Sequence, residues 1–399
     1  MEDVVIVSAV RTAIGRYGGA LKDQPSSSLA ATVIKASLDR SGVGKDQVDE
    51  VIFGEVRQTT EASNVARVAA LRAGIPEESP AYTINRLCAS GLQCVASAVQ
   101  QILFKQADIV VAGGTESMSR SPIYLRNARF GGDRTHLVDS NTEAGQQPHE
   151  LYGSGLGMGV TAENVAERYG ISRKEQDQFA AESQRRAGRA VSNGKFKNEI
   201  VPVSLNKRGG TSIFETDEYP RPETTEEKLA ALPTVFKEGG TVTAGNACGR
   251  NDGAAALIMM RASKAEEMGL TPLARVVDWA ASGVSPEIMG IGPIPAVMKL
   301  LQRTGKRMED IGLFELNEAF ASQSLVVIQE LGLDRERVNV NGGAIALGHP
   351  VGASGARILV TLLHEMRKRN EQVGIAALCA GGGQGMALMV EQIDQKRKG

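Results

Sequence analysis

The sequence has few cysteines, almost no net charge and no long apolar segment. Four cysteines in 399 residues cannot form the disulfide framework of a secreted protein, and none has the spacing of a zinc site. The 45 basic and 46 acidic residues nearly cancel, which argues against a nucleic-acid surface or a polybasic membrane contact. No apolar run approaches the ~20 residues of a membrane-spanning helix. We therefore expect no metal, nucleic-acid or membrane partner.

The first residues and the cysteine usage indicate a compartment. A strand-like run at residues 4–7 leaves no room for a signal or transit peptide. Few, unpaired cysteines are typical of a reducing environment. We expect a cytoplasmic protein.

Strand-like runs alternate with helical periodicity along the first third of the chain, which predicts α/β layers around a largely buried sheet. The expected segments are 4–9, 29–41, 50–56, 62–73, 81–84, 91–104 and 109–112. Residues 121–243 are polar and carry their own predicted helices at 161–168 and 173–193, so we interpret them as an inserted loop domain. A strand at 254–260 completes the N-terminal half (1–120 with about 244–270). Residues 271–399 form a second α/β half.

One pattern occurs twice. Residues 82–93 and 108–114 give strand, Ala89-Ser90-Gly91 turn, helix, strand and Gly-rich turn. Residues 338–343, 348–355 and 374–383 repeat this order around Ala353-Ser354-Gly355. Two related halves predict a five-layered stack of helix, sheet, helix, sheet and helix. This duplication brings together Cys88, His349 and Cys379.

Cys88 precedes the predicted helix that begins near residue 89 or 90. A helix N-terminus presents free N–H groups and partial positive charge, which lower a thiol pKa below ~8.5 and favour the nucleophilic thiolate. The alternative is a buried structural cysteine. Cys94, on the same helix, is predicted to be a core residue.

His349 lies between glycines in Gly-His-Pro-Val-Gly-Ala-Ser-Gly. A neutral imidazole there can accept a proton from Cys88 or donate to a developing oxyanion. The other histidines, His136, His149 and His364, are assigned to the surface or to a satisfied core.

Cys379 ends a strand and enters Ala-Gly381-Gly-Gly, whose N–H groups can form an anion-binding nest. A phosphate-binding loop is the alternative, although the G-x-G-x-x-G spacing is missing. Asn317 follows a strand predicted at 313–316 and can orient a water, or it can be a helix N-cap. Glu318 beside it can shape the electrostatics.

These blocks resemble the thiolase family, and within it the biosynthetic type. The nucleophile block is similar to residues 85–92, the two oxyanion-site blocks to 317–320 and 348–357, and the base block to 379–383. Further similarity lies at 242–246, 251–255 and 289–296. The matches run in order from Ile6 to Met389, so they cover essentially the whole chain.

The resemblance implies a five-layered αβαβα fold whose loop domain binds coenzyme A, and a homotetramer or homodimer. It implies Claisen condensation of two acetyl-CoA to acetoacetyl-CoA, and the reverse thiolysis, with no tightly bound cofactor. Cys88 would take the acyl group, Cys379 would move the α-proton and His349 would assist. Asn317, through a water, and Gly381, through its N–H, would serve the oxyanion holes. The substrate contacts it implies are Arg221, Phe236, Ala244, Cys248, Met158, Met289 and Phe320.

Three positions depart from the biosynthetic pattern and bear on chain length: Gly157 stands where His is usual, Cys248 where Ser is usual, and Lys228 where a small polar residue is common. A degradative 3-ketoacyl-CoA thiolase for medium or long chains is therefore an alternative. The others are a ketoacyl-synthase-type condensing enzyme, a cysteine hydrolase, and a non-catalytic acyl or lipid carrier on a thiolase scaffold.

Overall fold

The computed structural model describes residues 2–132, 135–143, 145–207 and 210–393. An eleven-stranded sheet is its framework. The strands of the N-terminal half lie in the order β4 (Ala81–Ile84), β3 (Glu50–Gly54), β5 (Ile109–Ser117), β11 (Asn251–Arg261) and β1 (Val4–Thr12). Those of the C-terminal half continue as β12 (Ala274–Gly283), β15 (Gln384–Glu391), β14 (Val373–Ala380) and β13 (Leu313–Leu316). Two short strands, β2 (Gly15–Arg16) and β8 (Ile200–Val201), pair with β11 and β1.

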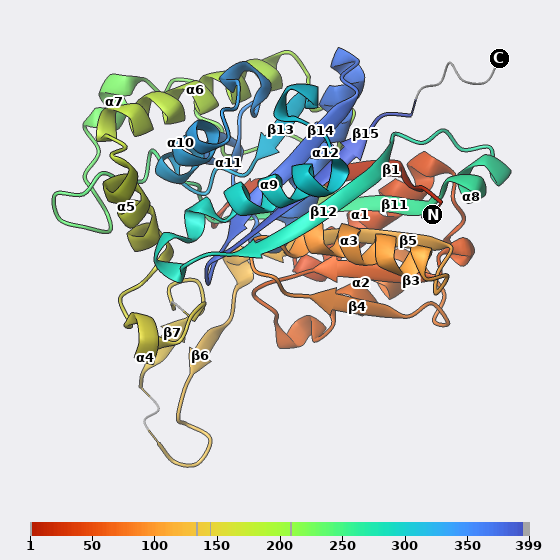
Figure 1. Ribbon diagram of the computed structural model, residues 1–399. Coiled ribbons are helices and arrows are strands. Elements are labelled where there is room, and N and C mark those ends of the chain that lie inside the picture. The colour runs from red at the N-terminus through yellow and green to blue at the C-terminus, as the bar shows by residue number, and fades with distance from the viewer. Residues whose placement is uncertain (1, 133–134, 144, 208–209, 394–399) are drawn as a thin grey trace.

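The two halves meet along β1 and β12. Val5 pairs with Arg275 and Ile6 with Ala274, so a short antiparallel ladder makes the two half-sheets continuous. Within the halves, β3 runs parallel to β4 and β5, and β13 runs parallel to β14. In Figure 1 the N-terminal half, in red and orange, lies at the lower right, with the blue C-terminal strands above it.

Helices complete five layers, as predicted. One outer layer is α1 (Ser26–Ser41) and α2 (Val65–Ala73), whose apolar side chains form a core with one face of the N-terminal strands. The middle layer is α3 (Ser90–Leu103) and α12 (Val351–Arg369), in a core shared by both half-sheets. The other outer layer is α9 (Pro293–Thr304) and α10 (Ala321–Glu330), against the C-terminal strands.

The duplication is visible in the strand order, with one difference. The strands of the N-terminal half follow the order β4, β3, β5, β11 and β1. The C-terminal half repeats this order as β13, β14, β15 and β12, with Val338 beside β13 in the position that corresponds to β4. A strand predicted from residue 338 is wrong, because only Val338 forms a parallel bridge, with Phe314. The side chain of Asn339 bonds the N–H and the C=O of Leu316 at 2.9 and 2.8 Å, in place of a backbone ladder. Asn339 itself has φ of 46°, which ends an extended run.

The other predicted elements of the two halves are present, with β5 extending five residues beyond its predicted end. The extension depends on glycine. A Cβ at Gly113 would lie 2.2 Å from the carbonyl oxygen of Ala255 on β11, and one at Gly114 would lie 2.1 Å from that of Gly352. The first turn of α12 therefore rests directly on the backbone of β5.

Between β5 and β11 the chain leaves the sheet and forms a largely separate layer. A hairpin of β6 (Ile123–Leu125) and β7 (Leu137–Asp139) projects with α4 (His149–Tyr152) at the lower left of Figure 1. The remaining elements are α5 (Met158–Tyr169), α6 (Arg173–Ser192), β9 (Val203–Lys207), β10 (Gly210–Phe214) and α7 (Glu226–Ala230). Two short helices lie elsewhere, α8 (Ala262–Glu267) and α11 (Ala344–Leu347). Within the described ranges, no helix has the length and apolarity needed to cross a membrane.

The contact between α3 and α12 generates a stability prediction. A Cβ at Gly355 would lie 2.4 Å from the backbone nitrogen of Leu92, so Gly355→Ala must separate the two helices. We expect a loss of about 1–3 kcal/mol in the free energy of unfolding, measured by urea titration. Gly155→Ala is the matched control, since nothing lies within 4 Å of its Cβ position. Equal stability of the two variants would contradict this packing.

Candidate active site

Cys88 lies in a tight turn between β4 and α3. Leu87 has φ of 50°, in the left-handed region that branched side chains rarely adopt. The hydroxyl of Ser90 holds this turn: it accepts from the N–H of Arg86 at 2.9 Å and donates to the carbonyl of Leu87 at 2.6 Å. Asn85 accepts from the N–H of Leu87 at 2.9 Å. The strained turn holds Cys88 half-buried at the head of α3, where the sequence predicted it.

The resting thiol of Cys88 differs from the prediction. Burial raises its pKa to about 11, although the N–H groups of Gly381 and of Cys88 itself and the charge of Arg57 oppose that rise. The prediction of a lowered pKa is wrong because the loss of hydration outweighs the helix N-terminus. The N–H of Gly381 faces the sulfur of Cys88, and a Cβ at Gly381 would lie 3.2 Å from Leu87 Cδ1, so the turn after β14 meets the head of α3.

Cys379 is the penultimate residue of β14 and is fully buried. Burial, followed by the neighbouring thiols of Cys88 and Cys248, raises its pKa well above the ordinary value. The three sulfurs therefore belong to one site. Beyond Cys379, Gly382 and Gly383 have φ of 73° and 82°, and they turn the chain tightly into β15.

His349 precedes α12 and is held at both its backbone and its ring. Its N–H donates to Asn251 Oδ1 at 2.9 Å, and its Nδ1 lies 2.6 Å from Ser354 Oγ. Because the Ser354 hydroxyl donates to the carbonyl of Pro350 at 2.8 Å, Nδ1 must be the donor in the ring contact. Nε2 then carries the lone pair. It is buried and has no partner among the described residues.

The charge state of His349 follows from its surroundings. Burial, and then the charge of Arg357, lower its pKa to about 4. The imidazole is therefore neutral at physiological pH, and its free Nε2 is an acceptor.

The heads of α3 and α12 bring Cys88 and His349 to the same end of the middle layer. A Cβ at Gly91 would lie 3.0 Å from Gly352 O and 2.7 Å from Ala356 N, so the two first turns touch. A third element, β5, holds the same end in place through hydrogen bonds. Glu116, at the end of β5, accepts from Gly352 N–H at 2.9 Å and from Val56 N–H at 3.0 Å.

Asn317 follows β13 and is fully buried. Its backbone N–H donates to the carbonyl of Ala377 on β14 at 2.9 Å, but neither side-chain atom has a partner among the described residues. Buried carboxamides are normally hydrogen-bonded, so this site is suited to a bound water or a polar ligand group. The helix N-cap alternative is wrong, because α10 is preceded by Phe320 and begins four residues after Asn317.

Glu318 has a structural environment of its own. Its carboxylate accepts from Ser183 Oγ at 2.7 Å, Asn339 Nδ2 at 2.8 Å and Ile345 N–H at 3.2 Å. These bonds tie the loop that carries Asn317 to α6 and α11.

An apolar wall surrounds Cys379. Its buried members are Ala162, Val242, Ala247, Met289, Ala319 and Phe320, with Met158 packed against them. Phe236 extends the wall: its ring meets that of Phe320 edge-to-face, with centroids 6.4 Å apart. The structure thus places four of the predicted substrate contacts in this wall around Cys379: Met158, Met289, Phe320 and Phe236.

The other three predicted contacts lie on two segments. Cys248 is half-buried beside the wall, and its N–H donates to Ala319 O at 3.0 Å. Ala244 is exposed in the turn just before. The guanidinium of Arg221 lies over the ring of Tyr219, 5.7 Å from the ring centroid. Cys94, predicted as core, is fully buried in the middle layer.

Four supporting residues were not singled out from the sequence: Ser354, Asn251, Glu116 and Arg357. A signal existed for Ser354, because it stands in the second Ala-Ser-Gly. Its counterpart Ser90 donates to the carbonyl three residues before it, and Ser354 to the one four residues before it. The repeat itself therefore marked a hydroxyl that fixes each helix start. Asn251, Glu116 and Arg357 act from buried positions that no local pattern reveals.

Comparison with known proteins agrees with the fold. The families "Thiolase, N-terminal domain" and "Thiolase, C-terminal domain" match residues 4–263 and 270–392. The chain is 50% identical over 400 residues to "Acetyl-CoA acetyltransferase" of Syntrophomonas wolfei, covering 98% of this chain and 99% of that protein. The Escherichia coli protein of the same name is also 50% identical, with coverage of 99% and 100%.

Solved structures give the same result. The Bacillus anthracis acetyl-CoA acetyltransferase superposes with a TM-score of 0.95 at 46% identity, over 98% of this chain and 99% of that one. Human mitochondrial 3-ketoacyl-CoA thiolase in complex with CoA gives 0.93 at 43% identity, over 98% of both chains. The resemblance inferred from the sequence motifs is confirmed: this chain belongs to the thiolase family.

Proposed function

We propose that this chain is an acetyl-CoA C-acetyltransferase, which condenses two acetyl-CoA to acetoacetyl-CoA and CoA and catalyses the reverse thiolysis. The observation that carries the proposal is the meeting of Cys88, Cys379 and the Gly381 N–H at one site. Relatives named acetyl-CoA acetyltransferase at 50% identity support it. A hydrolase or a carrier would have no use for the second thiol.

The first half-reaction transfers an acetyl group to Cys88. With thiol and imidazole pKa values of about 11 and 4, the resting pair is neutral, so the proton moves to His349 Nε2 as the sulfur attacks the thioester carbonyl. The N–H groups of Cys88 and Gly381 stabilise the oxyanion. CoA leaves as a thiolate and takes the proton of Cys379, which becomes the base for the next step.

The second half-reaction makes the carbon–carbon bond. The Cys379 thiolate removes a proton from the methyl group of a second acetyl-CoA. His349 Nε2–H and a water held by Asn317 stabilise the enolate oxygen. The enolate carbon attacks acetyl-Cys88, which releases the Cys88 thiolate, and His349 returns the proton to it. Both thiols and the imidazole are then in their starting states.

The substrate reaches this site along the inserted layer. We assign residues 121–243 to CoA binding, with Arg221 and Phe236 toward the nucleotide and Met158 and Met289 toward the acyl and pantetheine groups. Ala244, Cys248 and Phe320 border the same path. Coenzyme A acts here as a substrate. A cytoplasmic location stays a prediction from the sequence, and a homotetramer or homodimer stays a prediction from the resemblance.

Separating the two half-reactions tests the roles of the thiols. Cys88→Ala is expected to form no acetyl-enzyme with acetyl-CoA, because the acceptor sulfur is gone. Cys379→Ser is expected to acetylate Cys88 slowly and to lose condensation by at least about a thousandfold, since the hydroxyl is a far weaker base. Intact-mass spectrometry and acetoacetyl-CoA formation measure the two effects. An acetylated Cys88→Ala protein would refute the assignment.

The raised thiol pKa values generate a pH prediction. A thiol is deprotonated above its pKa, so alkylation of Cys88 by iodoacetamide should rise about tenfold per pH unit from pH 7 to 10. Cys88 should also react first, since Cys94 and Cys379 are fully buried and burial raises the pKa of Cys248 to about 12. Peptide mapping by mass spectrometry measures each site. A plateau below pH 8 would show a low-pKa thiolate instead.

Chain length is tested in the thiolysis direction. We expect acetoacetyl-CoA to be cleaved at least about tenfold faster, in kcat/KM, than 3-ketooctanoyl-CoA. Gly157, beside Met158, has no atom within 4 Å of its Cβ position, which leaves room that a histidine would fill. Gly157→His should therefore lower the rate with the longer substrate and leave that with acetoacetyl-CoA within about twofold. A preference for 3-ketooctanoyl-CoA would instead support a degradative thiolase.

A further inference from the structure

The segment 241–248 borders the acyl site but lies outside the helices and longer strands. It contributes Val242 and Ala247 to the wall around Cys379. Ala247 forms an isolated antiparallel bridge with Phe320, next to the loop of Asn317. Isolated backbone bridges hold the segment at Thr243, with Thr234, and at Ala247, and side chains shape the residues between them.

Asn246 supplies part of that shape from inside the loop. It is fully buried, and its Oδ1 accepts from Thr243 N–H at 2.8 Å while its Nδ2 donates to Thr241 O at 3.1 Å. Its carbonyl accepts from the N–H of Ala321, the first residue of α10, at 2.9 Å. The loop is thus folded around one carboxamide and fastened to the start of α10.

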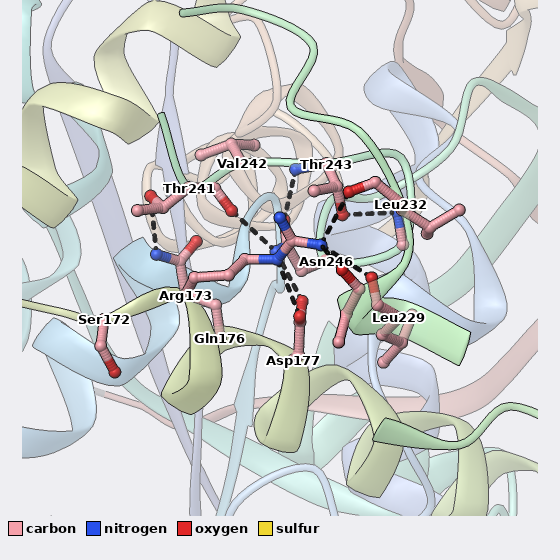
Figure 2. Close-up of polar contacts among 12 residues, drawn as sticks. Ser172, Arg173, Gln176, Asp177, Leu229, Leu232, Thr241, Val242, Thr243 and Asn246 are labelled. Carbon is pink, nitrogen blue, oxygen red and sulfur yellow. Dashed lines mark hydrogen bonds and ion pairs between the residues drawn. The ribbon is translucent and has the colours of Figure 1, made fainter. Parts of the chain in front are cut away.

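Asp177 connects this carboxamide to the inserted layer (Figure 2). One carboxylate oxygen accepts from Asn246 Nδ2 at 3.0 Å and the other from Arg173 Nε at 2.7 Å. Arg173 also donates through Nη2 to Leu229 O at 2.7 Å and Leu232 O at 2.9 Å, at the end of α7. Asp177 is 3% exposed, so these charge-assisted bonds are shielded from water. One buried carboxylate therefore joins α6, the end of α7 and the segment 241–248.

We propose that Asp177 is a positioning residue for the acyl-CoA site, acting through Asn246, with Arg173 holding its carboxylate in place. The inference rests on the proposed function for the identity of the ligand. The Asp177 carboxylate serves two donors at once, one on each oxygen. A carboxamide would turn an NH₂ group toward one of them, and the segment carrying Ala244, Ala247 and Cys248 would shift.

Paired substitutions test this route. Asp177→Asn and Asn246→Asp should each raise the KM for acetoacetyl-CoA and CoA about tenfold and lower kcat less than about threefold, because the wall moves while Cys88 and Cys379 stay in place. The double variant restores a donor–acceptor pair between positions 177 and 246 with reversed roles, but it leaves a carboxylate oxygen against the carbonyl of Thr241, so it should recover part of the lost KM. Arg185→Gln is the control: Arg185 lies on the same helix, is exposed and pairs with Glu182, so both constants should stay within about twofold.

Calorimetric titration with CoA alone separates this inference from the proposed function. If the unaltered protein binds CoA without cleaving acetoacetyl-CoA, the proposed function fails, while weaker CoA binding by Asp177→Asn would still support the positioning role. The inference is overturned if Asp177→Asn lowers only the thermal unfolding midpoint and leaves KM and CoA affinity unchanged. It is also overturned if the double variant is no better than the worse single variant.

Discussion

The contact between the first turns of α3 and α12 is the constraint on which the site depends. Each helix has a glycine at the point of contact, Gly91 on α3 and Gly355 on α12, and any side chain there would meet backbone atoms of the other helix. Since Cys88 and His349 each stand two residues before one of these helices, this one contact places the thiol of Cys88 and the ring of His349 at the same end of the middle layer. The half-sheets on either side then contribute the turn after β14 and the loop after β13.

Burial determines the chemistry at that end. It raises the pKa of the Cys88 and Cys379 thiols and lowers that of the His349 imidazole, so every reacting group is neutral before the substrate arrives. Neutral groups can be enclosed in an apolar wall without a large desolvation cost. In the proposed mechanism, charge develops only when a thioester enters, and the N–H of Gly381 and a water held by the unpartnered carboxamide of Asn317 receive it.

Much of the fold was predictable because local sequence patterns determine it. Alternating periodicities give the layers, and the repeated Ala-Ser-Gly marks both central helix starts and the residues beside them. The predictions that failed concern features that local patterns do not determine. The side chain of Asn339 replaces the ladder of a predicted strand, and no local pattern shows the burial that raises the pKa of Cys88. The bond between Asp177 and Asn246 joins residues 69 positions apart, and neither belongs to a motif that identifies the other.

The two serines of the repeat, Ser90 and Ser354, occupy equivalent positions and have different roles. Each hydroxyl donates to a carbonyl just before its helix. At Ser90 the remaining lone pairs support a strained corner, whereas at Ser354 they accept from an imidazole and so determine which of its nitrogens bears hydrogen. An ancestral half with one such hydroxyl would already have had a rigid helix N-terminus. After duplication of this half, one helix N-terminus could present a nucleophile and the other a base, without any new backbone geometry.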